Sequence, residues 1–116
     1  MRFEVEVHPD SQAIRVPYIR SYEVTVEDEE IILTSAEDDY EYHFAYEDFQ
    51  SAEFRIGDGD LWMKNIINGE SLLITGDKKA WKREAALVMI ARINDKCKVI
   101  NFRNYERFTR SLWPFS

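Results

Sequence analysis

Two histidines, one cysteine and a short acidic turn are the residues of this 116-residue chain whose types could do chemistry. His8 and His43 lie in separate predicted strands, whereas a metal site needs two or more convergent ligands, usually at short spacing. The acidic turn at 58–60 lacks the further ligands and the closing glutamate of a calcium loop. Cys97 falls near the end of a predicted helix, away from the positive helix N-terminus that activates a thiolate. We therefore predict neither a metal site nor a cofactor site.

The remaining candidates for catalysis do not form pairs. Glu47 and Asp48 are adjacent, so a strand would point their carboxylates to opposite faces and leave no facing acid–base pair. Gly57 and Gly59 do not open a phosphate-binding loop, because no Gly-Lys-Ser/Thr sequence follows them. The sequence shows no nucleophile beside a base, and we predict that the protein is not an enzyme.

Short strands followed by one long helix are the elements that must position any site. Residues 2–7 and 22–26 alternate polar and apolar side chains, which is typical of half-buried strands. Asn68-Gly69 is the strongest hairpin signal, and Asp77 is a natural N-cap for a helix from Lys78 to Asn94 or Lys96. The predicted strands are 2–7, 22–26, 31–34, 40–46, 51–56, 61–67 and 70–75.

This order of elements predicts a mainly β (α+β) fold. We expect an antiparallel, strongly bent sheet or a small barrel, capped by one C-terminal helix. Apolar residues recur at roughly helical spacing from Phe102 to Leu112, so we also expect a short tail helix that ends before Pro114. The length fits a single domain over residues 1–116, with a core at 1–97 and a basic, aromatic tail at 98–116.

The composition is that of an ordinary globular protein, with 45% hydrophobic and 14% aromatic residues. The longest apolar run, Ala85 to Ala91, has seven residues, whereas a membrane-spanning helix needs about 20, so we expect no stable membrane insertion. The single cysteine cannot form an intramolecular disulfide, and residues 1–7 alternate instead of forming a leader. We therefore expect a soluble, cytoplasmic protein.

Charge is distributed unevenly along the chain. Residues 1–77 carry 19 Asp/Glu and 5 Lys/Arg, a balance of −14, whereas residues 78–116 carry 3 Asp/Glu and 10 Lys/Arg, a balance of +7. One interpretation is that a basic helix lies over an acidic sheet, and the other is that a basic surface is offered to an acidic partner. Nucleic acid is not favoured as a partner, because the acidic part would repel phosphate and no RNA-binding or zinc-finger signature is present.

The predicted helix has two apolar stripes, about a quarter turn apart at 100° per residue. The first contains Met89, Ile90 and Ile93, and the second contains Trp81, Ala85 and Val88. The first stripe would lie on the sheet, and we expect Trp81 to be buried near the start of the helix. The second stripe needs a cover of its own, which either the tail of the same chain or another subunit could supply.

Aromatic residues and arginine are concentrated in the tail, and these residue types are enriched at the centres of interfaces. Our leading hypothesis is a non-enzymatic protein-interaction module that self-associates, for instance as a homodimer, or binds a protein partner through the helix and tail. We expect the tail to be ordered and to cover the second stripe. The predicted partner-binding residues are Trp81, Val88, Phe102, Arg103, Tyr105, Arg107, Arg110 and Trp113.

Two alternatives stay open at this point. The first is a small-ligand-binding or enzymatic domain whose aromatic sheet face, around Tyr40, Tyr42, Tyr46 and Trp62, forms a pocket. Packing into the core explains most of the Tyr40–Tyr46 aromatic run equally well. The second alternative is peripheral binding to an anionic membrane through the arginines and the tryptophan of the tail.

Residues 21–96 resemble a bacterial pleckstrin-homology-like (GRAM-like) domain in the rhythm of their elements. The resemblance rests on the run 24–33, the corner Tyr46-Glu47-Asp48-Phe49, the segment 69–74 and the helix from Asp77. It implies a seven-stranded, strongly bent barrel or sandwich whose open end is plugged by the helix. Some eukaryotic members bind phosphoinositides through clustered Lys/Arg in the first hairpin loop. This chain has only Arg15 and Arg20 between residues 8 and 20, so we do not expect phosphoinositide binding.

Overall fold

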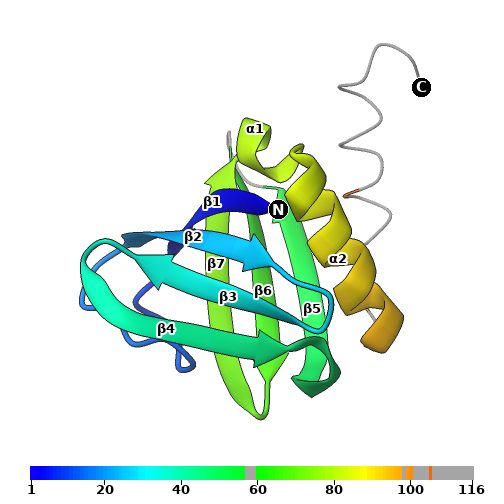
Figure 1. Ribbon diagram of the computed structural model, residues 1–116, viewed down its shortest axis with the longest axis horizontal. Helices are drawn as coiled ribbons and strands as arrows, with labels where there is room; N and C mark the ends of the chain where they lie inside the picture. The colour runs from blue at the N-terminus through cyan, green and yellow to red at the C-terminus, as the bar shows by residue number, and fades with distance from the viewer. Residues whose placement is uncertain (57–59, 98, 101–104, 106–116) are drawn as a thin grey trace.

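The computed structural model describes residues 1–56, 60–97, 99–100 and 105. In this part of the chain, strands dominate and one main helix follows them (Figure 1). The elements are β1 (Arg2–Val7), β2 (Arg20–Val26), β3 (Glu30–Ser35), β4 (Asp38–Ala45), the 3₁₀ turn η1 (Tyr46–Asp48), β5 (Phe49–Ile56), β6 (Asp60–Ile67), β7 (Glu70–Asp77), α1 (Lys78–Trp81), α2 (Glu84–Lys96) and β8 (Val99–Ile100).

The described strands form one open sheet of eight strands in the order β4-β3-β2-β1-β7-β6-β5-β8. The β1–β7 pairing has only two residue pairs, Glu6 with Thr75 and Val7 with Ile74. The sheet bends strongly there, so β2, β3 and β4 run across β5, β6 and β7 (Figure 1). The mainly β fold and the bent sheet are confirmed, but the barrel is wrong because the sheet is not closed. The sheet is also mixed, since β8 pairs with β5 in parallel.

The interior lies between the two halves of the bent sheet, and α2 packs against it. The alternation of β1 places Phe3, Val5 and Val7 inward and buries all three. The helix contributes Met89 and Ile93, which are also fully buried, and α2 contacts β1, β2, β5 and η1. At about 25 cal/mol per Å² of apolar area, this shared burial is the main term that stabilises the fold. No helix in the described part of the chain is long and apolar enough to cross a membrane.

The hairpin between β6 and β7 has the turn that its sequence predicts. Asn68 and Gly69 both have positive φ, 52° and 81°, as a type I′ turn requires. The Gly69 amide donates to Gln50 Oε1 at 2.7 Å, and the Asn68 amide donates to the Asp48 carbonyl at 3.2 Å. The turn is therefore tied to the η1–β5 corner.

The prediction of one main helix after the strands is confirmed, but its continuous course from Lys78 is wrong, because the chain breaks the helix at Arg83. Asp77 caps α1 as predicted, its Oδ1 accepting from the Ala80 amide at 2.8 Å. Arg83 then adopts an extended backbone, with ψ at 147°, and α2 begins at Glu84. On one continuous helix, Trp81 and Ile90 would lie about 180° apart, so both could not face the same sheet. The break changes the phase, and Trp81 and Ile90 are both buried.

The aromatic run of β4 lies only partly in the core. Tyr46 is buried, but Tyr42 and Phe44 are half-buried and Tyr40 is 64% exposed. The physical reason is that β4 is an edge strand, so side chains at its outer end have no neighbouring strand on one side. Core packing therefore explains most of this run, as predicted, since Tyr42, Phe44 and Tyr46 contact the core and Tyr40 does not.

Candidate functional site

Two of the predicted partner-binding residues, Trp81 and Tyr105, lie in the core. Trp81 is 0% exposed and Tyr105 is 1% exposed. Trp81 Nε1 donates to the Leu61 carbonyl at 2.6 Å, and the Tyr105 hydroxyl donates to the Trp81 carbonyl. The predicted burial of Trp81 is confirmed, but neither ring offers surface to a partner in this structure.

An aromatic cluster explains why these two residues are buried. The centre of the Trp81 ring lies 5.6 Å from the centre of the Phe3 ring and 6.3 Å from that of Tyr105. The ring centres of Phe54 and Tyr105 are 4.9 Å apart. Burial raises the pKa of the Tyr105 hydroxyl well above its ordinary value, so the hydroxyl stays protonated and can donate. Tyr105 thus supplies, from the tail, a cover for Trp81.

The rest of the predicted tail surface is described only in part. Val99 is buried where β8 pairs with β5, and Val88 is half-buried against the core. Val99 and Tyr105 are therefore two tail residues that pack on their own domain, whereas the expectation that the whole tail is ordered and covers the second stripe stays a prediction. Phe102, Arg103, Arg107, Arg110 and Trp113 lie outside the described residues, as does the predicted tail helix.

The structure does not bring together the aromatic residues of the alternative ligand pocket. Tyr46 is buried, and its hydroxyl donates to the Glu27 carbonyl at 2.8 Å. Tyr40 and Tyr42 pack on each other on β4, with ring centres 4.8 Å apart. Trp62 lies on β6, in the other half of the sheet. The expectation of one aromatic pocket formed by these four residues is therefore wrong.

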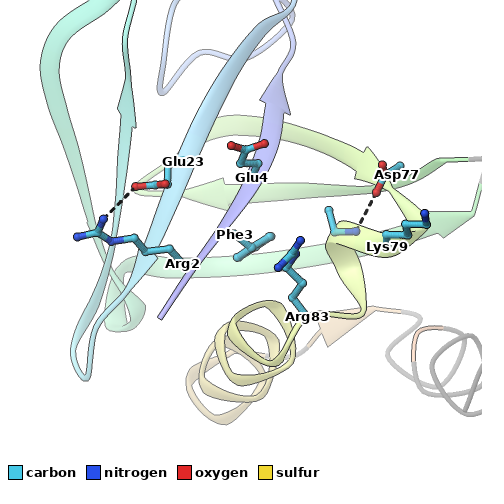
Figure 2. A pocket seen from close by; sticks show the side chains of 8 residues that line it. Arg2, Phe3, Glu4, Glu23, Asp77, Lys79 and Arg83 are labelled. Atoms are coloured by element: carbon cyan, nitrogen blue, oxygen red, sulfur yellow. Dashed lines mark hydrogen bonds and ion pairs between the residues drawn. The ribbon is translucent and has the colours of Figure 1, made fainter.

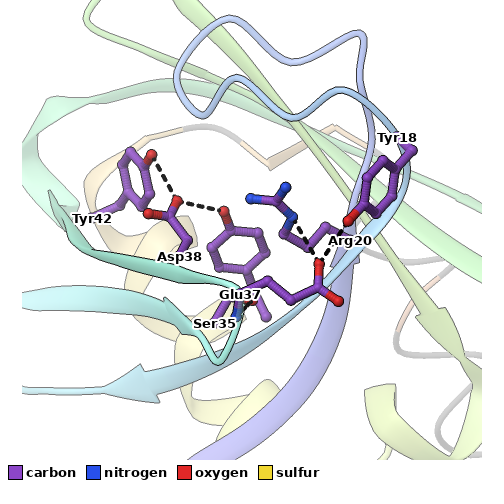
Figure 3. Close-up of polar contacts among 7 residues, drawn as sticks. Tyr18, Arg20, Ser35, Glu37, Asp38 and Tyr42 are labelled. Carbon is purple, nitrogen blue, oxygen red and sulfur yellow. Dashed lines mark hydrogen bonds and ion pairs between the residues drawn. The ribbon is translucent and has the colours of Figure 1, made fainter.

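A polar cluster joins β2, β4 and the loop before β2 (Figure 3). Asp38 Oδ2 accepts from the hydroxyls of Tyr22 at 3.0 Å and Tyr42 at 3.1 Å. Beside it, Arg20 Nε forms an ion pair with Glu37 Oε2 at 3.1 Å. Burial, followed by the hydrogen bond to Asp38, raises the pKa of Tyr22 to about 12. The carboxylate of Asp38 is already occupied by these donors, so the cluster fastens strands and leaves no reactive group.

A charged hollow of about 410 Å³ lies between the start of β1 and α1 (Figure 2). Arg2 Nη1 pairs with Glu23 Oε1 at 3.7 Å on one side. Lys79 and Arg83 line the other side, and Phe3 also lines the hollow. Arg2 and Glu23 are 69% and 43% exposed in their side chains, so water screens their charges. Charged side chains dominate the lining of this hollow, and its apolar lining residues are Phe3 and Ala80.

A second candidate is a groove on the outer face of β6 and β7. Two hollows of about 530 Å³ and 500 Å³ adjoin there and share Trp62 and Leu73. We call their combined lining the Trp62 groove. Its lining residues are Glu6, His8, Asp10, Gln12, Ile19, Arg55, Asp60, Trp62, Lys64, Ile66, Ser71, Leu73 and Thr75.

Apolar residues at outward positions form the floor of the Trp62 groove. Trp62, Ile66 and Leu73 point away from the core and are half-buried, whereas their strand neighbours point inward and are buried. An outer face exposed to water would ordinarily carry polar residues at these positions. The signal was readable in the sequence, because Leu61-Trp62-Met63 and Leu72-Leu73-Ile74 break the polar–apolar alternation.

The segment after β1 forms one wall of the groove and is held firmly. The His8 amide donates to the Leu73 carbonyl at 3.1 Å, and the Leu73 amide donates to Ser11 Oγ at 2.9 Å. A hydrogen bond of 3.0 Å also joins His8 Nε2 and Thr75 Oγ1. These bonds fix the wall against β7, so the groove is formed in advance of any binding event.

The charges of the groove are arranged around its apolar floor. The Arg55 guanidinium lies 5.4 Å from the centre of the Trp62 ring, and its Nε pairs with Glu53 at 2.9 Å. Lys64 lies in the same hollow as Arg55, whereas Glu6 and Asp60 line the adjoining one. Among the described residues, no group of three or more His, Cys, Asp or Glu side chains could hold a metal ion. The arrangement favours binding of an amphipathic chain segment.

Comparison with known proteins found neither a matching family model nor a matching curated relative.

Proposed function

We propose that this protein is a non-enzymatic protein-interaction module that binds a segment of a partner protein in the Trp62 groove. The class of function is the one that the sequence predicts, but the contact surface differs, because Trp81 and Tyr105 lie in the core. The pleckstrin-homology-like architecture stays part of this proposal and rests only on the rhythm of the elements in residues 21–96.

The observation that carries the proposal is a half-buried indole shared by two adjoining hollows on a preformed outer face. Tryptophan is among the residues most enriched at binding hot spots, where a partner's side chain covers it and excludes water. Trp62 is already held by the Arg55 guanidinium on one side, so it loses little side-chain freedom on binding.

The chemistry of the lining describes the partner segment. An apolar anchor would cover Trp62 and Leu73, where the floor is apolar. A basic group would lie toward Glu6 and Asp60, and an acidic group would lie toward Lys64. Such charge matching affects orientation and association rate more than affinity.

The test uses a random peptide library displayed on phage and selected against the full chain. We expect enriched peptides that share an apolar anchor residue. The decisive variant is Trp62→Ala, which should weaken these peptides by at least about tenfold, as truncation of a hot-spot residue does. The matched control is Ile56→Ala, because Ile56 is 51% exposed and does not line the groove.

Both variants should keep the melting temperature within a few degrees, so that a loss of binding is not a loss of folding. Failure to enrich any peptide, or peptides that bind Trp62→Ala as tightly as the original protein, would overturn the proposal. Equal losses in Trp62→Ala and Ile56→Ala would also count against a specific groove.

Self-association and membrane binding through the tail stay predictions. They depend on residues such as Arg103, Arg107 and Trp113, which lie outside the described part of the chain. Light scattering after size exclusion tests self-association, and salt-sensitive binding to anionic vesicles tests the membrane alternative. Neither result depends on the Trp62 groove.

A further inference from the structure

A second surface, independent of the Trp62 groove, is the free edge of β4. This strand is the last in the sheet on its side, and β3 is its only partner among the described strands (Figure 1). An edge strand presents backbone donors and acceptors that can pair with another chain. The β4 edge and the Trp62 groove lie in different halves of the sheet.

The pairing with β3 determines which backbone groups of β4 face outward. The Tyr46 amide donates to the Glu29 carbonyl at 3.1 Å, so this pair is of the hydrogen-bonded type. Every second pair along an antiparallel ladder repeats that type, which assigns Phe44 and Tyr42 to it as well. The amides and carbonyls of His43 and Ala45 therefore point to the free edge, and beyond Tyr42 the register with β3 shifts.

The two faces of β4 differ in chemistry along the same edge. Tyr42 and Phe44 lie on the inner face and are only half-buried, because no strand continues the sheet beyond them. Glu41 and His43 lie on the outer face and are exposed. An added strand would extend both faces, so its side chains would need to alternate between apolar and polar.

Charge determines the polar half of that alternation. Residues 21–54 contain 12 Asp/Glu and no Lys/Arg. Within the described residues, ion pairs from arginines outside this stretch reach four of these carboxylates, Glu23, Asp28, Glu37 and Glu53. Glu41 lies 3.5 Å from His43 Nε2 and has no arginine or lysine partner among the described residues. A second copy of β4 would bring like charges together, which is unfavourable for cross-strand pairs.

We propose that the β4 edge binds an extended basic segment of a partner protein by strand addition. The segment would alternate Lys or Arg, on the face of Glu41, with apolar residues that cover Phe44 and Tyr42. The backbone groups of His43 and Ala45 supply affinity without regard to sequence, and the two faces supply specificity.

The probe is a short fluorescent peptide that alternates valine with arginine and lysine, titrated against the full chain by anisotropy. A peptide with glutamate in place of the basic residues is its control. We expect binding of the basic peptide, weakened by added salt, and no binding of the acidic one. Amide hydrogen exchange should slow at His43 and Ala45 when the basic peptide is bound.

The decisive variant is His43→Pro, because proline removes a backbone donor that points to the free edge and is tolerated on edge strands. It should weaken the basic peptide by about tenfold relative to His43→Ala, the matched control that loses the same side chain. Glu41→Lys should weaken the basic peptide. Circular dichroism checks that each variant is folded.

Equal binding by His43→Pro and His43→Ala would overturn the proposal, because it would show that no edge donor is used. Loss of binding in Trp62→Ala would also overturn it, since the peptide would then lie in the Trp62 groove. A dimer in light scattering without peptide, abolished by His43→Pro, would identify a second copy as the occupant instead.

Discussion

Removal of the Tyr105 side chain tests whether the start of the tail belongs to the folded core. Tyr105 is 1% exposed, packs on Phe54 and Trp81, and donates its hydroxyl hydrogen to the Trp81 carbonyl. Tyr105→Ala removes both the ring and the hydrogen bond. Tyr105→Phe removes the hydrogen bond alone and leaves the ring packing in place.

The expected magnitudes follow from burial. An aromatic side chain buries about 150–250 Å², which at about 25 cal/mol per Å² gives an upper bound of about 4–6 kcal/mol. Measured truncations of buried aromatics cost about 3–5 kcal/mol, and we expect Tyr105→Ala to lower the free energy of unfolding by that amount. Tyr105→Phe leaves a buried carbonyl without this donor, which should cost about 1–3 kcal/mol.

Urea unfolding followed by far-UV circular dichroism measures these differences, with the slope m compared between variants. The matched control is Tyr40→Ala, because Tyr40 is the same residue type but is 64% exposed. It should cost no more than about 1 kcal/mol. If Tyr105→Ala costs no more than Tyr40→Ala, the tail does not pack on Trp81 in solution and the reasoning is wrong.

Three further predictions test the cap, the β3–β4 pair and the polar cluster. Asp77→Ala should lower the free energy of unfolding by about 0.5–2 kcal/mol and Asp77→Asn by much less, because asparagine also accepts from the helix amides; thermal unfolding checks this. The hydrogen bond to Glu30 raises the pKa of His43 above its ordinary 6.5. The protonated His43–Glu30 pair therefore stabilises the folded state at low pH, and this stabilisation is lost as pH rises through the raised pKa. Glu30→Gln should lower the pKa of His43 in an NMR titration. The pKa of Tyr22 is raised to about 12, so the folded state should lose stability as pH rises from about 10 to 12; Tyr22→Phe should remove one late step from the ultraviolet titration of tyrosinate.

Features with local causes were predictable from the sequence. The Asn68-Gly69 turn depends on two adjacent residues that tolerate positive φ, and the Asp77 cap depends on a carboxylate three residues before the amide it binds. The inward positions of β1 follow from simple alternation. In each case the deciding interaction lies within a few residues, so a sequence pattern can contain it.

Features with distant causes were not predictable. Lys82 and Arg83 are good helix formers, and the helix breaks there while Trp81 is anchored to the Leu61 carbonyl, 20 residues earlier in the chain. Trp62 was identified as a candidate ligand residue, but with the wrong neighbours. Its true neighbours depend on the strand order β1-β7-β6-β5, which no local pattern specifies.

The acidic excess of residues 21–54 has a physical explanation in the edge position of β4. Among the described residues, Arg92–Asp28 is the ion pair between α2 and the sheet region, and the interpretation of a basic helix over an acidic sheet stays a prediction. An exposed edge strand with half-buried aromatics risks pairing with copies of itself, and repulsion between like charges opposes that pairing. The same charges attract a basic strand. Glu41 and its acidic neighbours can therefore both prevent aggregation and select a partner.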